Sequence, residues 1–310
     1  EARANSRSRL TALAAFAPIL ANGFVSYEDH FYIQNNPLIQ GLGLDHLRAM
    51  LTATRGGLWQ PLTWLSLAVD RALWGSEAAG FHATSLLLHA GTSVLFYLVC
   101  LRLLDGRKTA AMLAALFFAV HPLRVESVAW ASERKGLLSG FFAMAAALAH
   151  LHGRSRTALA AFAPSLAAKA SSLSLPLVLP ILEIHSPGRR PTRRAWLALA
   201  PFFALSAAAL GAAVLAGRAY GTIVDLEIYG VARRANHILY GLLFYPVKTL
   251  WPGNLSPFYP EPSWFGGWSW QTLACLGVLA ACVAALWRAR RTHPAVVSAF
   301  VVYAVMALPT

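Results

Sequence analysis

Two adjacent carboxylates, Glu28 and Asp29, follow directly after the first apolar stretch of the chain, where that stretch would meet water. Neighbouring carboxylates at such a place can orient an acceptor hydroxyl and take its proton, or can bind a divalent cation. A pair of acidic residues can also mark nothing more than the polar boundary of a helix. The two residues alone leave these interpretations open.

A second polar segment, residues 121–135, lies between two apolar stretches and reads HPLRVESVAWASERK. Its candidates for a substrate site are His121, Arg124, Glu126, Arg134 and Lys135. Arg and Lys together suit a phosphate, because the guanidinium adds directional hydrogen bonds and the ammonium adds a compact charge. A solvated loop with internal salt bridges would show the same residues, so this alternative also stays open.

Three of the four lysines fall on the side of the membrane that basic residues usually avoid, which makes them candidates for an anionic ligand. They are Lys135, Lys169 and Lys248. His82 and His89 are seven residues apart on one expected helix face, and ionisable groups inside a membrane are functional candidates. A hydrogen-bonded core pair explains these histidines equally well.

Several signatures are missing from the chain. It has no Walker loop, no GxGxxG after a strand and no HExxH helix, so the usual marks of nucleotide and zinc chemistry are absent. The three cysteines lie inside apolar segments and favour packing over a disulfide or a metal. The basic residues are scattered between apolar stretches rather than along one stripe, which argues against nucleic acid as a partner.

The composition predicts the elements that must position these residues. The chain is 57% hydrophobic and 13% charged, with a net charge of +13, whereas soluble domains are about 25% charged. Apolar windows long enough to cross roughly 30 Å of hydrocarbon recur along it. We therefore expect an all-α, polytopic integral membrane protein of about nine spans, with residues 1–310 forming one transmembrane domain.

The expected spans are residues 10–25, 81–104, 109–120, 136–150, two short ones within 157–184, 195–216, 270–287 and a last one in which the chain ends. Basic residues mark the cytoplasmic loops, and this rule leaves three segments outside: 27–79, 121–135 and 218–268. Residues 62–74 suit an interfacial helix. A full crossing by the apolar piece 238–251 would place the basic residues after 270–287 outside, against the same rule. We therefore expect this piece to be re-entrant or interfacial.

Several of these segments resemble a known family. They are EDHFYIQNNPLIQGL, WQPLTWLSLAVDRALWG, FHATSLLLH, HPLRVESVAWASERKGLLSGFF, AAKASSLSLPLVLPILEI and LLFYPVKTLWPGNLSPFYPEP. Together they look like the transmembrane and tetratricopeptide-repeat-containing (TMTC) type of O-mannosyltransferase, within the GT-C glycosyltransferase superfamily. The resemblance spans most of the chain, and HPLRVESVAWASERK is its most specific part. The family's repeats are not visible here, as expected for a piece of a longer protein.

The resemblance implies roles for the candidate residues. Asp29 would be the catalytic base and Glu28 its partner, although the family usually shows two Asp here, so the division of labour is open. Arg134 and Lys135 would contact the donor phosphate, with Arg124 and Lys248 as weaker contacts. No cofactor is required, but a divalent cation at Glu28 and Asp29 is compatible with the pair.

The activity implied is inverting transfer of a sugar, a hexose such as mannose, from a polyprenyl-phosphate donor to a hydroxyl of a protein Ser or Thr or of a glycan, on the non-cytoplasmic face. The alternatives are a lipid-linked saccharide transporter or flippase, and a scaffold whose activity is lost. The Ala- and Arg-rich composition favours a bacterial inner membrane over the endoplasmic reticulum.

Overall fold

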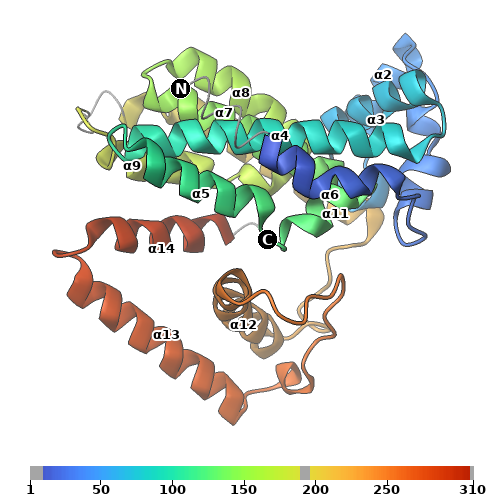
Figure 1. The fold of residues 1–310 in the computed structure, drawn as a ribbon. Coiled ribbons are helices and arrows are strands. Elements are labelled where there is room, and N and C mark those ends of the chain that lie inside the picture. The colour runs from blue at the N-terminus through green and yellow to red at the C-terminus, as the bar shows by residue number, and fades with distance from the viewer. Residues whose placement is uncertain (1–9, 189–195, 308–310) are drawn as a thin grey trace. The chain divides into compact units, whose positions relative to one another are not determined.

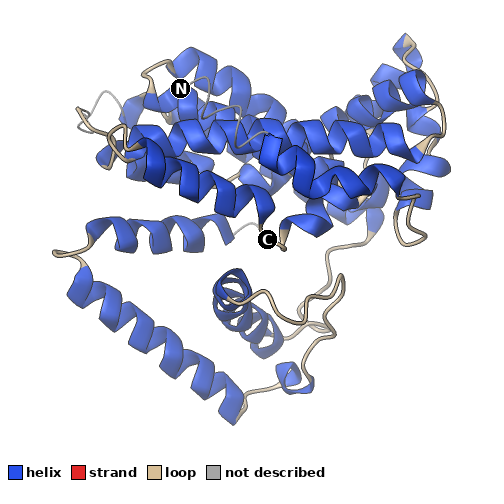
Figure 2. Cartoon of the chain, in the orientation of Figure 1, coloured by secondary structure: helices blue, strands red, loops and turns tan. Residues whose placement is uncertain are grey.

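The computed structural model describes residues 10–188 and 196–307, and within these ranges the chain forms helices and loops without a β-strand (Figure 2). The all-α expectation is therefore confirmed for the described part. In a membrane this is the expected solution, because each helix satisfies its own backbone hydrogen bonds. The chain divides into two compact units, with the boundary between Tyr220 and Gly221. The basic residues expected to mark cytoplasmic ends at positions 3–9 and 189–194 lie outside the described residues.

Three of the described helices are long and apolar enough to cross a membrane: α4 (Ala78–Leu103), α11 (Ala200–Tyr220) and α13 (Trp270–Ala289). Shorter apolar helices are Leu10–Ala21, α5 (Lys108–Val120), α9 (Leu175–Ile184) and α14 (Pro294–Ala307). These helices support a membrane protein, while the expected number of about nine spans stays a prediction.

In the first unit, α4 packs against α5 and α7 (Arg134–Leu151), and α7 packs against α8 (Ser155–Ala168) (Figure 1). Alanines allow this close approach: Ala111 and Ala115 of α5 are fully buried beside Tyr97 of α4. Small residues let helices in a membrane come close enough for extensive van der Waals contact. The bundle thus forms a rigid support for the polar segments at its ends.

The polar segment 27–79 is folded rather than extended. It contains the short helices η2 (His30–Gln34), η3 (Pro37–Ile39), α2 (Leu44–Thr52) and η4 (Arg55–Gly57), followed by α3 (Pro61–Trp74). Trp64 is completely buried in the apolar cluster beneath them. The helix expected over 62–74 is confirmed. Asp45 lies in the first turn of α2, after the N-cap residue Gly43, where a carboxylate interacts favourably with the positive end of the helix dipole.

The other polar segments at this end of the first unit are residues 121–133 and 169–174. α6 (Arg124–Ala129) and η5 (Ala131–Glu133) lead into α7. α8 ends at Ala168, and η6 (Ala170–Ser172) separates it from α9. Two helices with a break at Lys169 agree with the arrangement expected for 157–184. Whether both helices cross the membrane stays a prediction.

The second unit contains α12 (Val231–Leu250), η7 (Ser263–Gly266), α13 and α14. The apolar piece 238–251 lies almost entirely in α12, which is continuous through Pro246. Asn236 of α12 is buried, donates to the carbonyls of Phe265 and Gly267, and accepts a 2.8 Å hydrogen bond from the Thr272 hydroxyl. This network ties α12 to the start of α13; whether α12 re-enters or lies at the interface stays a prediction.

Candidate functional site

Asp29 joins two polar segments that are far apart in the sequence. Its Oδ1 accepts a 3.0 Å hydrogen bond from the Ser132 backbone N–H and a second one from the Ser132 hydroxyl. Its Oδ2 accepts a 2.9 Å hydrogen bond from the Val25 N–H. The residue is only 1% exposed. The segments 27–79 and 121–135 therefore meet at the same end of the bundle.

Beside Asp29, acidic and basic side chains alternate. The Lys135 ammonium lies 3.3 Å from Glu28 and 2.9 Å from Glu133, and Glu133 also lies 3.6 Å from the Lys169 ammonium. We call Glu28, Asp29, Glu133, Lys135 and Lys169 the charged cluster. Solvent reaches it mainly through two side chains, Lys169 at 37% exposure and Glu28 at 33%. Lys169 is the more exposed of the two lysines in the cluster.

Aromatic rings enclose the buried cation of the cluster. The Lys135 ammonium lies 4.8 Å from the ring centre of Tyr32 and 5.8 Å from that of Trp130. Tyr27 packs against Trp130 with ring centres 5.7 Å apart. Such rings attract a cation and exclude water from it. Burial also raises the pKa of Tyr32, so its hydroxyl stays protonated.

The charges around the cluster shift the ionisation of its members. Lys135 is the residue just before the expected span 136–150 and therefore lies outside it. Burial opposes its charge, yet Glu133 and Glu28 outweigh this effect and hold the pKa of Lys135 above its ordinary value. Burial and the nearby Glu133 raise the pKa of Glu126, although Lys169 acts in the opposite direction. Lys135 is therefore a fixed cation, and Glu126 is the carboxyl that protonates more readily than usual.

Arg134 follows the cluster in sequence but points into the bundle. Its side chain is fully buried, and Nη1 lies 2.7 Å from the Asp70 carboxylate of α3. The same guanidinium donates to the Ser66 hydroxyl at 2.9 Å and to the Phe81 carbonyl at 2.7 Å. Asp70 in turn accepts a 2.7 Å hydrogen bond from Thr84. Arg134 thus connects α3, α4 and the start of α7, and thereby fixes where Lys135 emerges.

The two histidines of α4 are buried with different surroundings. His82 lies with Nε2 3.5 Å from the Gly23 carbonyl, and its Nδ1 is buried without a hydrogen-bond partner. His89 lies with Nε2 2.9 Å from the Ala119 carbonyl and packs against the Phe16 ring. His89 therefore connects α4 and α5, whereas His82 has one ring nitrogen without a hydrogen-bond partner.

The remaining candidates lie apart from the cluster or are otherwise engaged. His121 Nδ1 accepts a hydrogen bond from the Leu123 N–H at 3.2 Å. Arg124 lies over the Phe118 ring, 5.1 Å from its centre. Lys248 belongs to the second unit and donates to the Gly253 and Asn254 carbonyls. The structure brings together Glu28, Asp29, Lys135 and Lys169, with Glu126 nearby.

Two residues that organise this end were not singled out from the sequence: Ser132 and Asp70. Ser132 carries no charge, so nothing in its type distinguishes it from other serines. Asp70 did give a signal, because it is the only carboxylate within the mostly apolar helix stretch LTWLSLAVDRALW. A buried carboxylate requires a cationic or hydrogen-bonding partner, and Arg134 is that partner.

A metal at Glu28 and Asp29 would need further ligands. Among residues 10–188 and 196–307 no group of three or more His, Cys, Asp or Glu side chains is placed to hold an ion. The Lys135 ammonium 3.3 Å from Glu28 would also repel a cation there. A cation bound at Glu28 would therefore have to compete with Lys135 for that carboxylate.

We expect Ser132→Ala to lower stability by about 1.5–3 kcal/mol, because it removes the hydroxyl that donates to the buried Asp29 carboxylate. The backbone N–H of residue 132 would remain bonded to Asp29. Thermal unfolding in detergent measures the loss. Ser76→Ala is the matched control, since the Ser76 hydroxyl accepts only an exposed hydrogen bond from Arg71; equal melting temperatures for both variants would contradict the expectation.

Parts of the chain are similar in sequence to known proteins. The chain is 38% identical over 92 residues to the mouse (Mus musculus) protein O-mannosyl-transferase TMTC3, covering 30% of this chain and 10% of the relative. It is 37% identical over 97 residues to human (Homo sapiens) protein O-mannosyl-transferase TMTC4, covering 27% and 13%. A longer match, 25% identical over 155 residues, joins it to protein O-mannosyl-transferase F38B6.6 of Caenorhabditis elegans, covering 46% and 22%.

These matches support a loose relationship to the TMTC-type proteins. The aligned part spans about a tenth to a fifth of the length of these relatives. No protein-family model matches the chain, and no solved structure matches it. The expected GT-C architecture therefore stays a prediction. The relatives are animal proteins and give no support to the expected bacterial inner membrane.

Proposed function

We propose that the protein is a membrane glycosyltransferase that moves a sugar, a hexose such as mannose, from a polyprenyl-phosphate donor to a hydroxyl of a protein or glycan on the non-cytoplasmic face. The observation that carries this proposal is the meeting of a buried carboxylate, Asp29, with the lysines of the charged cluster at one end of the bundle. The names of the relatives, all protein O-mannosyl-transferases, support it.

In this proposal Asp29 is the base. A carboxylate offers about four lone-pair positions, and Val25 and Ser132 use three of them. The remaining position would accept the proton of the acceptor hydroxyl. The hydroxyl oxygen attacks the anomeric carbon, and the bond between that carbon and the phosphate oxygen breaks with its electron pair on the phosphate. Attack from the face opposite the leaving group inverts the anomeric centre.

Cations of the charged cluster would stabilise the departing phosphate. Lys169 is the accessible one, and Lys135 is held behind it by Glu133 and Glu28. A prenyl chain buried in the bilayer, at about 0.8 kcal/mol per CH₂ group, would keep that phosphate near the membrane surface. Arg134 has its donors committed to α3 and α4, so we assign it the positioning of Lys135 rather than a contact with the donor. Arg124 and Lys248 remain weaker candidates for donor contacts.

We expect Lys169→Gln to lower the rate of sugar transfer by about 10²–10³-fold, the usual cost of removing one group that stabilises developing charge. Lys135→Gln should cause a similar loss and should also leave Glu28 and Glu133 without their shared cation. Steady-state rates with a polyprenyl-phosphate sugar measure the effect. Arg48→Gln, an exposed cation of the same end, should transfer at the normal rate; unchanged rates in both lysine variants would refute the phosphate assignment.

The decisive experiment uses the purified protein in liposomes. Candidate polyprenyl-phosphate sugars and an acceptor peptide or glycan are supplied on the same side, and the acceptor mass is followed. A mass increase of one hexose supports the transferase. The alternative, a lipid-linked saccharide flippase, could use the same lysines but needs no base, and it would move the donor across the bilayer without changing the acceptor.

A further inference from the structure

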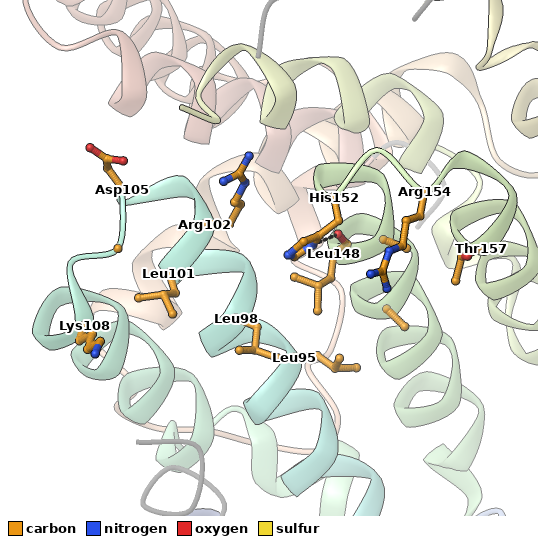
Figure 3. Close-up of a pocket in the computed structure, with 13 residues that line it drawn as sticks. Leu95, Leu98, Leu101, Arg102, Asp105, Lys108, Leu148, His152, Arg154 and Thr157 are labelled. Carbon is orange, nitrogen blue, oxygen red and sulfur yellow. Dashed lines mark hydrogen bonds between the residues drawn. The ribbon is translucent and has the colours of Figure 1, made fainter. Parts of the chain in front are cut away.

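A cavity of about 670 Å³ opens at the end of the first unit opposite the charged cluster (Figure 3). It lies where α4 ends and α5 begins, beside the end of α7 and the beginning of α8. The 18 residues of α7 separate the Lys135 end from this one, which corresponds to about 27 Å at 1.5 Å per residue. If α7 crosses the bilayer, as expected for residues 136–150, this cavity lies at the other membrane surface, since the hydrocarbon core is about 30 Å thick.

The interior wall of this cavity is apolar. Leu95, Leu98 and Leu101 line it from α4, three residues apart, so they share one helix face. From α7 come Ala145 and Ala149, whose small side chains leave the space that the leucines face. Figure 3 shows Leu98 and Leu95 progressively deeper along α4 than Arg102. A hydrocarbon chain would pack against this wall without removing water from any polar group.

The opening is cationic. Arg102, Lys108 and Arg154 line the cavity with a single opposing carboxylate, Asp105. Figure 3 shows Arg102 of α4 and Arg154, which directly precedes α8, with His152 between them. The Arg102 Nε is buried without a hydrogen-bond partner, and its Nη2 makes only a 3.4 Å bond to the Pro187 carbonyl. A buried guanidinium nitrogen without an acceptor is costly, and an anionic oxygen at this place would satisfy it.

We propose that this cavity binds an anionic phospholipid from the leaflet at this end of the bundle. The lipid phosphate is bound by Arg102 and Arg154, and one acyl chain lies along Leu98 and Leu95. Basic pockets between transmembrane helices hold anionic head groups in this manner. The volume falls within the 300–1,000 Å³ of ordinary ligand sites, which is enough for a head group and part of a chain. Free phosphate would leave the leucine wall unfilled, whereas a phospholipid matches both the cationic opening and the apolar wall.

The test is lipid retention by the whole chain in nanodiscs, followed by native mass spectrometry. Phosphatidylglycerol and phosphatidylcholine with identical acyl chains compete at equal amounts. We expect bound phosphatidylglycerol to exceed phosphatidylcholine, and its affinity to fall about fivefold in Arg154→Gln. In the double variant Arg102→Gln/Arg154→Gln the fall should be about thirtyfold, from roughly 1 kcal/mol per basic residue beside an anionic lipid.

Two controls separate this site from general surface charge. Arg156→Gln removes a basic residue of the same turn that does not line the cavity, and it should retain the lipid fully. Leu98→Trp fills the apolar part and should expel the lipid although every charge remains. Equal retention of both lipids, displacement by millimolar inorganic phosphate, or equal losses in Arg154→Gln and Arg156→Gln would overturn the proposal.

Discussion

Asp29→Asn should reduce sugar transfer by about 10²–10⁴-fold, because the amide cannot take the proton of the acceptor hydroxyl. The amide oxygen can still accept the two Ser132 hydrogen bonds, while the new NH₂ group would face the Val25 N–H. We therefore expect a small additional loss of stability, about 1–3 kcal/mol for the lost Val25 hydrogen bond. Transfer rates and melting temperature are measured on the same reconstituted protein, so that a catalytic defect is distinguished from unfolding.

Two matched variants define the role of Asp29. Asp45→Asn changes a fully solvated carboxylate of the same polar segment and should leave transfer unaffected. Glu28→Gln keeps the side-chain length but removes half of the acidic pair, and we expect a smaller loss than for Asp29→Asn. If Glu28→Gln abolishes transfer while Asp29→Asn retains it, Glu28 is the base. Full activity in both variants would end the proposed mechanism.

Arg134→Met should lower stability by about 3–5 kcal/mol, because it leaves the buried Asp70 carboxylate without its cation. The loss is measured by thermal unfolding in detergent and by the rate of proteolysis. Arg71→Met is the control, since Arg71 follows Asp70 in α3 but bonds only the exposed Ser76 hydroxyl. An unchanged melting temperature in Arg134→Met would show that the ion pair contributes little.

The double variant Arg134→Met/Asp70→Leu tests what Arg134 does for activity. Replacing both partners removes the unpaired charge, so most of the lost stability should return. If Arg134 only positions Lys135, sugar transfer should return with the fold. A variant that folds normally but stays inactive would instead place Arg134 in contact with the donor, as the resemblance implied.

The main helices could be predicted from the sequence because their signal is local. Apolar windows gave the positions of α4, α5, α7 and α13 within a few residues. The interruption of 157–184 by Lys169, Pro176 and Pro180 indicated two short helices, which correspond to α8 and α9. Charge parity predicted that the segments 27–79 and 121–135 share one side. The contact between Asp29 and Ser132 agrees with that prediction.

The roles inside the site were less accessible, because they depend on side-chain direction. Arg134 and Lys135 are adjacent in sequence, yet successive residues of a helix point about 100° apart. Arg134 therefore enters the bundle towards Asp70, and Lys135 reaches Glu28. No property of the two residue types reveals which faces which way. Ser132 escaped notice for a similar reason, since its contribution is a hydrogen bond rather than a charge.

The hydrogen bonds between Asp29 and Ser132 join residues 103 positions apart, and this separation matters for biogenesis. A ribosome that adds 5–20 residues per second needs about 5–20 s to synthesise the intervening chain. During that interval the Asp29 carboxylate has no Ser132 to bind. The contact between segments 27–79 and 121–135 can therefore form only after α4 and α5 have been synthesised.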